Sequence, residues 1–526
     1  MQDTIERAIC RKAKQLLKRD ELARRQEKKH RERFEKRTGA TAAIGSHKQP
    51  GPWKVHPHFD PAYCIKHSKF LAKVIWQKLN SREYKPLPAI QYNIPKDSGG
   101  SREIMVFSIP DAAIANLFHR KLTTRNLNSF SANCYSYRPD RNLFDAVIQL
   151  QSALAGDRIY VVQYDFKKYF DSISHSYLTK IIDSRMFLAT DLERSVIKSF
   201  LMHRYADHTS YAASEFKVRS VGVPQGCSLS LFLSNVAGHE LDKSLEMKNG
   251  QFVRFADDVV VVTYSYEDAV SVVSAFARHR SRSGVAINFE KSPGILMLRS
   301  GIGDLDRSLF ISNGEGGEIR HAREFDYLGH KFIGRQKDLN GEVGLSSRAV
   351  KRIKKKIASI IHIHLLQNPR SRKLFDAARI GAGFHDWDLI TCLNEIRRYI
   401  YGSLREREIM KFLNENEKLR RVKGLMAFYP LVTTQIQLSS LDGWLVNILR
   451  RALTERARVL ASLGYGYAAP TPKQIVDGSW YNYPAIFSET ECPSFVRGWR
   501  AARKYYFKYG LKDIKAPSYY SIVAAY

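Results

Sequence analysis

The 526-residue sequence predicts an α+β protein. Between residues 156 and 335, short apolar strands alternate with amphipathic helices. Within that region the segment FVRFADDVVVV (252–262) places two strand-forming runs on either side of a turn, as an antiparallel hairpin requires. After about residue 345 the pattern becomes mainly helical and basic. Strands interleaved with helices around an antiparallel hairpin are typical of the α+β class.

Composition and charge narrow the class of protein. Hydrophobic residues make up 44% of the chain, which is enough for sizeable buried cores and excludes a disordered chain. Lys and Arg total 84 and Asp and Glu total 52, which gives a formal net charge of +32. Such a balance most often indicates a polyanionic partner, because basic side chains neutralise phosphates and release counterions. Ribosomal and membrane-surface proteins share this property, so the charge alone does not identify the partner.

The cysteines and the apolar segments indicate a cytoplasmic protein. The six cysteines are scattered without Cys-x-x-Cys spacing, which argues against a zinc knuckle and a disulfide framework. We expect them to be buried free thiols in a reducing compartment. The N-terminal segment lacks the apolar core of a signal peptide, and runs such as Val259–Val262 are too short to span a bilayer.

The N-terminal half begins with a charged stretch. Residues 11–37 are rich in good helix formers and poor in apolar residues, so residues 1–50 are expected to form a basic N-terminal arm with a loop at its end. This helix could contact RNA or simply expose a solvated face, and the sequence leaves both readings open. The segment 92–109 then predicts two short strands around a Gly/Ser turn. Residues 110–127 predict a helix with Pro110 near its start.

The central and C-terminal elements follow from the same periodicities. RIYVVQYDF (158–166) predicts a buried strand, and residues 175–186 and 192–204 predict amphipathic helices. A further helix over 266–284 should end at Gly284. Helices are also predicted over 346–366 and 441–463, and the region after that becomes rich in Tyr, Trp and Phe.

Three acidic residues are the candidates for chemistry. The buried strand 158–166 reaches Asp165, and a carboxylate there is unfavourable unless something pairs with it. A tight turn in the hairpin would place Asp257 or Asp258 beside Asp165. Phosphoryl transfer commonly uses two divalent metals about 3.5–4 Å apart, which need clustered carboxylates, and Mg²⁺ prefers oxygen ligands. On its own, an Asp-Asp pair more often marks an exposed turn.

A third segment favours the metal-site interpretation over an exposed turn. Residues 220–236, SVGVPQGCSLSLFLSNV, contain a Pro-Gln-Gly loop that opens an apolar helix. At such a loop the chain can pass close to a base pair or a template strand. The order of Asp strand, Pro-Gln-Gly loop and Ala-Asp-Asp hairpin, at these separations, is a combined signal that none of the three provides alone.

These segments resemble the palm motifs of reverse transcriptases, most closely those of the bacterial group II intron and retron type. YDFKKYFDSI (164–173) resembles the first catalytic motif, GVPQGCSLSLFLSN (222–235) the helix-loop motif and FADD (255–258) the YADD box. INFEKS (287–292) and FDYLGHKF (325–332) resemble two downstream motifs, the second of them the primer grip. Five motifs in order cover about residues 90–335, with a weaker thumb-like match to about 420.

The resemblance implies a right-hand polymerase architecture. Its parts would be the basic arm (1–50), the fingers (51–155), the palm with an antiparallel sheet and helices (156–335), a helical thumb (336–420) and a helical, aromatic-rich C-terminal extension (421–526).

The resemblance also assigns roles at the catalytic centre. Asp165, Asp257 and Asp258 would bind two Mg²⁺ ions, with Mn²⁺ as a possible substitute, and the backbone carbonyl of Phe166 would assist. Phe170, five residues after Asp165, falls at the steric gate, where a bulky ring excludes a 2′-OH and favours dNTPs. Core packing is the alternative role of this ring, and both can hold.

Further assignments concern the nucleotide, template and primer. Lys96 and Arg102 match fingers positions that grip the triphosphate, although without the resemblance they would be ordinary hairpin charges. The other assignments are Gln225 near the incoming nucleotide, Lys291 near the pyrophosphate, Pro224 and Gly226 near the template, and Tyr327, Leu328 and Gly329 in the primer grip. Arg254 could pair with acids or contact nucleic acid, and His119 and His175 are taken as structural.

Two departures indicate a divergent branch. Leu231 stands where the family usually has Pro, and Phe255 lacks the hydroxyl of the usual Tyr; neither removes a metal ligand, so we expect activity. The C-terminal region shows no Cys/His endonuclease module and no clear maturase match. It looks more like divergent bacterial enzymes associated with phage defence, many of which work with a structured noncoding RNA, and this step is an analogy.

The expected activity is RNA-directed DNA synthesis from dNTPs and a 3′-OH. An untemplated or protein-primed nucleotidyltransferase on the same palm is an alternative, because the many Tyr residues near the tail could supply a primer hydroxyl. A maturase-like RNA-binding scaffold with a vestigial site is another, and the intact set of three acids argues against it. A purely structural basic protein would explain the charge but not the ordered motifs.

Overall fold

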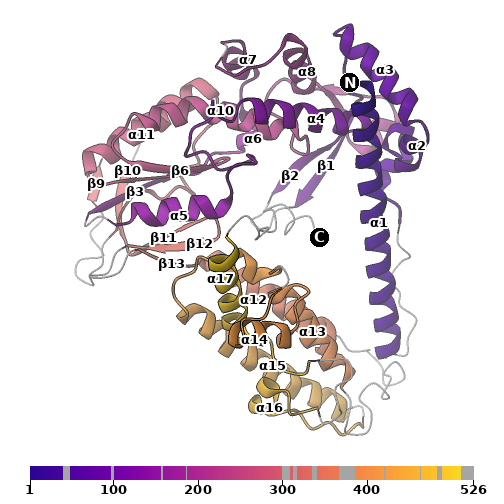
Figure 1. The fold of residues 1–526 in the computed structure, drawn as a ribbon, viewed down its shortest axis with the longest axis vertical. Coiled ribbons are helices and arrows are strands. Elements are labelled where there is room, and N and C mark those ends of the chain that lie inside the picture. The colour runs from indigo at the N-terminus through magenta and orange to yellow at the C-terminus, as the bar shows by residue number, and fades with distance from the viewer. Residues whose placement is uncertain are drawn as a thin grey trace. The chain divides into compact units, whose positions relative to one another are not determined.

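The computed structural model describes residues 1–38, 48–95, 100–155, 158–184, 186–298, 309–311, 317–334, 341–366, 386–419, 422–462, 464–481 and 489–510 (Figure 1). The chain forms two compact units. Unit 1 contains residues 1–27 and 46–323, and unit 2 contains residues 28–45 and 324–526. Among the described helices, none has both the length and the apolar character that crossing a membrane requires.

The first sheet of unit 1 is built around the strand pair predicted for residues 92–109. It has the strand order β2-β1-β4-β5, with β1 (Ala89–Pro95), β2 (Ser101–Val106), β4 (Arg204–Ala206) and β5 (Lys217–Val218). Strands β1 and β2 are antiparallel, with Ile94 opposite Arg102. The predicted hairpin is therefore confirmed, while Lys96 lies outside the described residues.

The second sheet of unit 1 is the larger one. Its strand order is β6-β7-β3-β8-β10-β9, with β3 (Ile159–Tyr164), β6 (Gln251–Phe255), β7 (Asp258–Thr263), β8 (Gly294–Leu298), β9 (Leu309–Ile311) and β10 (Gly317–Ala322). Strand β7 lies between β6 and β3, so the residues Val259–Val262 are buried on both faces. A continuous run of β-branched residues suits a strand in that position.

Two long helices accompany this sheet, α10 (Leu229–Glu246) and α11 (Tyr266–Ser283), and Figure 1 shows them side by side along it. The local sequence fixes the ends of α11. The Ser265 hydroxyl accepts a hydrogen bond from the backbone N–H of Asp268 at 3.1 Å, and Gly284 ends the helix with φ +76°. The predicted helix over 266–284 is therefore confirmed.

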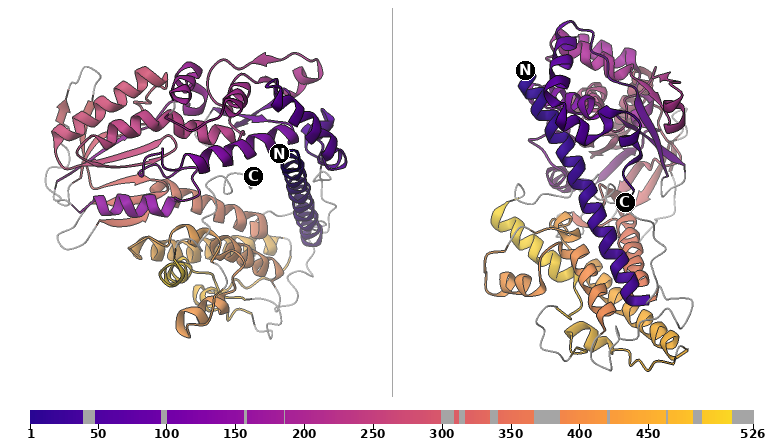
Figure 2. Two further views of the ribbon diagram at one scale, coloured as in Figure 1. Left: turned by 45° about the horizontal axis from the view of Figure 1, so that its top comes forward. Right: turned by 90° about the vertical axis from the view of Figure 1, so that its right-hand side faces the viewer.

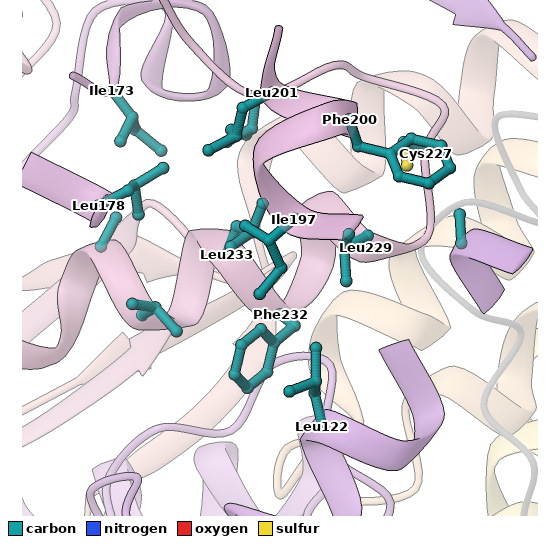
Figure 3. Close-up of a cluster of buried hydrophobic side chains, with 14 of the residues drawn as sticks. Leu122, Ile173, Leu178, Ile197, Phe200, Leu201, Cys227, Leu229, Phe232 and Leu233 are labelled. Carbon is teal, nitrogen blue, oxygen red and sulfur yellow. The ribbon is translucent and has the colours of Figure 1, made fainter. Parts of the chain in front are cut away.

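The N-terminal turns of α10 anchor that helix in the core of unit 1. Leu229, Phe232 and Leu233 are buried and pack in one hydrophobic cluster with Ile197 and Phe200 (Figure 3). The last two residues belong to α8 (Asp191–Leu201). Burying large apolar side chains contributes roughly 1.5–3 kcal/mol each. The loop that precedes α10 is thereby attached to a rigid base.

Helix α1 (Gln2–Thr38) has a structural role at its beginning. Ile5, Ile9 and Ala13 are fully buried in the core of unit 1, and their four-residue spacing places them on one helix face. The two readings considered for this stretch, an RNA-binding arm and a solvated helix, both omit this packing. Beyond residue 20, the described side chains of unit 1 on this helix are mostly exposed.

Unit 1 contains further helices, some of which were predicted. They are α2 (Pro61–Lys66), α3 (Ser68–Asn80), α4 (Ile109–Arg125), α5 (Leu143–Ala153), α6 (Tyr169–Ser172), α7 (His175–Asp183), α8 and α9 (His208–Ala212), with 3-10 turns at Gly51–Lys54 and Pro57–Phe59. The predicted helices over 175–186 and 192–204 are confirmed but end earlier, at Asp183 and Leu201. The second must stop there because strand β4 begins at Arg204.

Unit 2 combines a small sheet with a group of helices, coloured salmon to yellow in Figure 2. The sheet is antiparallel and consists of β11 (Glu324–Tyr327), β12 (His330–Ile333) and β13 (Glu342–Leu345). The helices are α12 (Ser347–Ile361), α13 (Trp387–Tyr401), α14 (Glu406–Asn414), α15 (Ile436–Ser462), α16 (Pro472–Asp477) and α17 (Phe495–Tyr509), with a π turn at His362–Leu366 and a 3-10 turn at Leu425–Phe428.

Both units mix helices with antiparallel strands, and the predicted α+β class is confirmed. The mainly helical character predicted after residue 345 is also confirmed for the described residues. All six cysteines are free thiols, of which Cys10 is half-buried and the others are buried. The finer division of the chain into arm, fingers, palm, thumb and extension stays a prediction.

Candidate active site

Strand register brings the three predicted carboxylates to one edge of the large sheet. Tyr164 of β3 lies opposite Val259 of β7, so the next positions on the two strands are Asp165 and Asp258. Asp258 also pairs with Phe255 across the β6–β7 hairpin, which leaves Ala256 and Asp257 as the turn. Because Asp257 and Asp258 are consecutive, the hairpin holds both near the end of β3. Asp165 and Asp257 are half-buried, and Asp258 is exposed.

The charges of two nearby groups act on the Asp257 carboxyl. Burial raises the pKa of the Asp257 carboxyl above its ordinary value, and the nearby charge of Asp165 raises it further. The Arg102 guanidinium acts in the opposite direction and lowers this pKa. Strand β2 thus contributes the positive charge of Arg102 near Asp257, whose carboxylate is repelled by that of Asp165. Arg102 is one of the residues predicted to grip a triphosphate.

Asp165 is held by a segment that follows α11. Asn288 donates from its backbone N–H to the carbonyl oxygen of Asp165 at 2.7 Å and from Nδ2 to its carboxylate at 3.3 Å. The backbone N–H of Asp165 donates to the Ser292 hydroxyl at 2.9 Å. Both partners flank Lys291, whose side chain is exposed on the same turn. Sequence reasoning singled out Lys291 and did not identify Asn288 or Ser292, although the motif INFEKS contains all three.

Phe166 and Phe170 lie on the two sides of a tight bend. Phe166 is buried, and its ring packs against the rings of Tyr169 and Phe276. Lys168 has a left-handed backbone with φ +46° and leads into the short helix α6. Phe170 on α6 is half-buried and contacts Tyr169 edge to face, with centroids 5.9 Å apart. Packing is thus one role of Phe170, and its role as a steric gate stays a prediction.

The Pro-Gln-Gly loop is fixed on two sides. Gln225 donates from Nε2 to both carboxylate oxygens of Asp171, at 3.1 and 3.2 Å. Its backbone carbonyl oxygen accepts a hydrogen bond from the backbone N–H of Met105 in β2 at 2.7 Å. Gly226 has φ +104°, and a Cβ atom there would collide with the Met105 carbonyl oxygen. Pro224 is buried. The loop therefore contacts both α6 and β2. Sequence reasoning did not identify Asp171 as the partner of Gln225.

Arg254 pairs with an acid in the interior. Its side chain is 1% exposed and donates to both carboxylate oxygens of Asp242 at 2.6 Å. The reading in which Arg254 contacts nucleic acid is therefore wrong, and the reading in which it pairs with an acid is confirmed. A fully buried guanidinium needs such a partner, because an unpaired charge away from water is very unfavourable.

The two departures from the family pattern have local structural roles. Leu231 lies in the first turn of α10, and its backbone N–H donates to the Ser228 carbonyl at 3.1 Å, a bond that proline could not form. The Phe255 ring lies beside that of Tyr137, with centroids 6.4 Å apart.

The two histidines and the primer-grip residues have the following local environments. His175 contacts the Gly222 carbonyl oxygen at 2.7 Å, and His119 contacts Thr123 at 3.3 Å, in agreement with structural roles. Tyr327, Leu328 and Gly329 form the β11–β12 turn, and Leu328 and Gly329 both have positive φ. These three residues belong to unit 2, and their role with a primer stays a prediction.

The donor set at the carboxylate edge fits Mg²⁺. In the described part of the chain, no three His, Cys, Asp or Glu side chains are grouped closely enough to hold a metal ion by themselves. Mg²⁺, however, is usually held by one or two carboxylates together with substrate phosphates and water. Asp165 and Asp257 repel each other, and a cation between them would remove that repulsion. Asp258 supplies a further oxygen donor on the exposed side.

Comparison with known proteins gives a family match for part of the chain. Residues 94–332 match the family described as "Reverse transcriptase (RNA-dependent DNA polymerase)". Protein YkfC of Escherichia coli (strain K12) is 24% identical over 294 residues, which is 52% of this chain and 74% of YkfC. The group II intron-encoded protein LtrA of Lactococcus lactis subsp. cremoris is 28% identical over 194 residues, which is 36% of this chain and 31% of LtrA.

Intron-encoded relatives are matched over a minor part of their length. The putative COX1/OXI3 intron 2 protein of Saccharomyces cerevisiae, 26% identical over 170 residues, is matched over 19% of its chain and 32% of this one. Among solved structures, telomerase from Candida albicans in complex with a TWJ fragment of telomeric RNA has a TM-score of 0.38 and 14% identity. That match covers 76% of this chain and 68% of the telomerase chain.

The family match spans the carboxylate edge, the Pro-Gln-Gly loop and the β11–β12 turn. The expectation of an enzyme of the polymerase type is thereby confirmed for this part of the chain, and the α+β fold is the one predicted for a right-hand polymerase. Residues 94–332 of this chain are thus similar to the reverse transcriptase (RNA-dependent DNA polymerase) family.

Proposed function

We propose that the chain adds dNTPs to a 3′-OH in a reaction directed by an RNA template. The observation that carries this proposal is the placement of Asp165 and Asp257 at one sheet edge, where the charge of Arg102 also acts on Asp257. An acidic pair next to a cation, beside an anchored Pro-Gln-Gly loop, is suited to bind a metal-bound triphosphate.

In the proposed reaction, the primer 3′-hydroxyl loses its proton to solvent, and its oxygen forms a bond to the α-phosphorus of the dNTP. The bond from that phosphorus to the oxygen that bridges to the β-phosphate breaks, which releases pyrophosphate. Two Mg²⁺ ions held by Asp165, Asp257 and Asp258 would lower the pKa of the attacking hydroxyl and neutralise the triphosphate and the leaving group. The Phe166 carbonyl would assist in holding them. The contribution of the protein is then mainly position and electrostatics.

The residues around this centre would orient the substrates. Arg102 and Lys96 would hold the triphosphate, with Lys291 near the pyrophosphate. Gln225, fixed by Asp171, would contact the nucleotide and template beside Pro224 and Gly226. The half-buried ring of Phe170 would lie beneath the sugar and exclude a 2′-OH. Tyr327, Leu328 and Gly329 would support the primer end.

The proposed partner is a structured noncoding RNA that serves as template, in an antiviral role and in the cytoplasm. The net charge of +32 supports an RNA partner. Helix α12 adds to this, because its apolar side is buried through Ile353 and Ile357 while Arg348, Lys351, Arg352 and Lys355 are exposed. Basic side chains on one helix face supply sequence-independent phosphate contacts.

The sequence of the product tests this function against its alternatives. The protein is purified with its bound RNA, supplied with Mg²⁺ and labelled dNTPs, and the DNA is sequenced. DNA complementary to one bound RNA supports templated synthesis. Homopolymer, or DNA linked to a tyrosine of the protein, would instead favour the untemplated or protein-primed enzyme. Tight RNA binding without synthesis, on this RNA and on a generic primed template, would favour the scaffold.

A further inference from the structure

The turn that carries the catalytic acids contains a strained residue. Ala256, directly before Asp257, has a left-handed backbone with φ +61°. A non-glycine residue in this conformation is uncommon and strained, so it persists only where its surroundings enforce it. The orientation of Asp257 and Asp258 follows from this backbone, because both residues come directly after it.

Two buried groups hold Ala256 from both of its backbone polar atoms. Its N–H donates to the Ser136 hydroxyl at 2.9 Å. Its carbonyl oxygen accepts a hydrogen bond from Nη1 of Arg254 at 3.1 Å. Ser136 is itself fixed by Asn235, which accepts from the Ser136 hydroxyl at 2.9 Å and donates to its carbonyl at 2.7 Å. Neither backbone group of this turn residue is therefore left to solvent.

Helix α10 supplies the base on which Arg254 rests. Asn235, Gly238 and Asp242 are spaced along α10 at intervals that place them on one face. Asp242 binds the guanidinium with both oxygens. Gly238 makes room for it, because a Cβ atom there would lie 2.6 Å from the Arg254 Cζ atom. The helix that begins at the Pro-Gln-Gly loop thus also positions the guanidinium behind the acidic turn.

We propose that Arg254, held by Asp242, is a positioning residue that fixes the Ala256–Asp257 turn and so orients the carboxylates of Asp257 and Asp258. The proposal rests on the proposed function for its kinetic consequence. Its structural consequence, the rigidity of the turn, can be measured without catalysis. A guanidinium suits this task because its planar fork can donate to Asp242 and to the Ala256 carbonyl at the same time.

The alternative is that the Arg254–Asp242 pair contributes only to folding. A buried ion pair can often be replaced by apolar residues of similar volume with little loss of stability, whereas removing one partner strands a buried charge. The double variant Arg254→Met/Asp242→Leu therefore separates the two roles. It removes both charges and keeps the volume, and it deletes the hydrogen bond to Ala256. Arg254→Lys is the second variant, since lysine can neutralise Asp242 but lacks the fork.

The experiment measures three quantities on both variants and on the wild-type chain. These are the midpoint of thermal unfolding, the amide hydrogen exchange rate of Ala256 compared with Val260 in β7, and kcat and KM for dNTP on a primed RNA template. We expect the unfolding midpoint of the variants to stay near the wild-type value. Amide exchange at Ala256 should become faster by at least about tenfold, while exchange at Val260 stays unchanged. The kcat should fall by about 10–100-fold, because small misplacements of catalytic groups have effects of this size. KM should change little.

The outcomes are distinct. A folded double variant with wild-type exchange at Ala256 and wild-type kcat would overturn the positioning role. If the double variant fails to fold, Arg254→Lys decides the question by the same two readouts. If the wild-type chain makes no DNA, the proposed function fails. The exchange rates then decide the positioning role alone, and faster exchange at Ala256 still supports it.

Discussion

Gln225 donates from a single amide nitrogen to both carboxylate oxygens of Asp171, at 3.1 and 3.2 Å. The two residues are 54 positions apart in the chain. Asp171 lies on α6 beside Phe170, and Gln225 lies in the loop that leads into α10. The contact therefore ties the residue proposed to contact the incoming base to the helix that carries the proposed sugar gate.

The first prediction concerns this contact. Asp171→Ala should lower kcat/KM for dNTPs by about tenfold or more, because a hydrogen bond to a charged group is worth roughly 1.5–3 kcal/mol and its loss frees the Gln225 amide. Asp171→Asn keeps one acceptor oxygen and should give an intermediate value. Steady-state kinetics on a primed RNA template measure both. Wild-type kcat/KM in the alanine variant would show that Asp171 does not position Gln225 for catalysis.

The second prediction concerns sugar selection. Shrinking Phe170 to Val or Ala should raise the use of rNTPs relative to dNTPs by about tenfold or more, because a smaller side chain leaves room for the 2′-OH. Incorporation of matched rNTP and dNTP pairs gives this ratio directly. Since Phe170 also packs against Tyr169, the unfolding midpoint should be recorded alongside. A folded variant with unchanged discrimination would remove the gate role and leave packing alone.

The third prediction concerns the Pro-Gln-Gly loop. Gly226→Ala should lower the free energy of unfolding by at least about 1 kcal/mol and reduce polymerisation, because φ +104° is strained for alanine and the new Cβ meets the Met105 carbonyl. Gly443→Ala in α15 is the matched control, since a Cβ atom there would meet no described atom within 4 Å beyond its chain neighbours and the local backbone of its own helix. That change should be neutral or slightly stabilising. Equal behaviour of the two variants would contradict the close approach of the loop to β2.

The fourth prediction concerns pH. The pKa of Asp257 is raised in the folded chain by burial and by Asp165, so its ionised form opposes folding at neutral pH and this penalty fades as pH falls through the folded pKa towards the unfolded one. Asp257→Asn should therefore raise the unfolding midpoint at pH 7 without metal, and the gain should shrink at acid pH. Added Mg²⁺ should reduce the gain by stabilising the wild-type chain. A variant that is less stable than wild type at pH 7 would contradict this arrangement.

Much of the secondary structure of unit 1 could be predicted, because the local hydrophobic patterns and the strand register indicate the same arrangement. The apolar runs around Asp257 and Asp258 require a hairpin, and a two-residue turn leaves Asp258 level with Asp165 once β7 pairs with β3. The sequence alone could not reveal the left-handed Ala256, since its backbone is enforced by Ser136 and Arg254 from elsewhere in the fold. For the same reason, the sequence does not decide whether Arg254 pairs with an acid or contacts nucleic acid.

For some other residues, the sequence contained a pattern that indicated their role, but neighbouring charges obscured it. Ile5, Ile9 and Ala13 lie at helical spacing, but the surrounding charges favour a basic arm over residues 1–50, either on RNA or as a solvated helix. Asn288 and Ser292 stand on either side of Lys291, whose charge drew attention away from the two residues that contact Asp165. Pairs such as Gln225 and Asp171 are set by tertiary packing and leave no local pattern.

The most direct test of the central claim is extension of a labelled primer on an RNA template by wild-type protein and by Asp257→Ala/Asp258→Ala. RNA binding is measured on the same preparations. We predict Mg²⁺-dependent DNA synthesis by the wild-type chain, and no incorporation by the double variant with nearly unchanged RNA affinity, because the exchanged groups hold the metal ions and contribute little to RNA contacts. Synthesis at the wild-type rate by the double variant would contradict the assignment of these carboxylates to the catalytic centre.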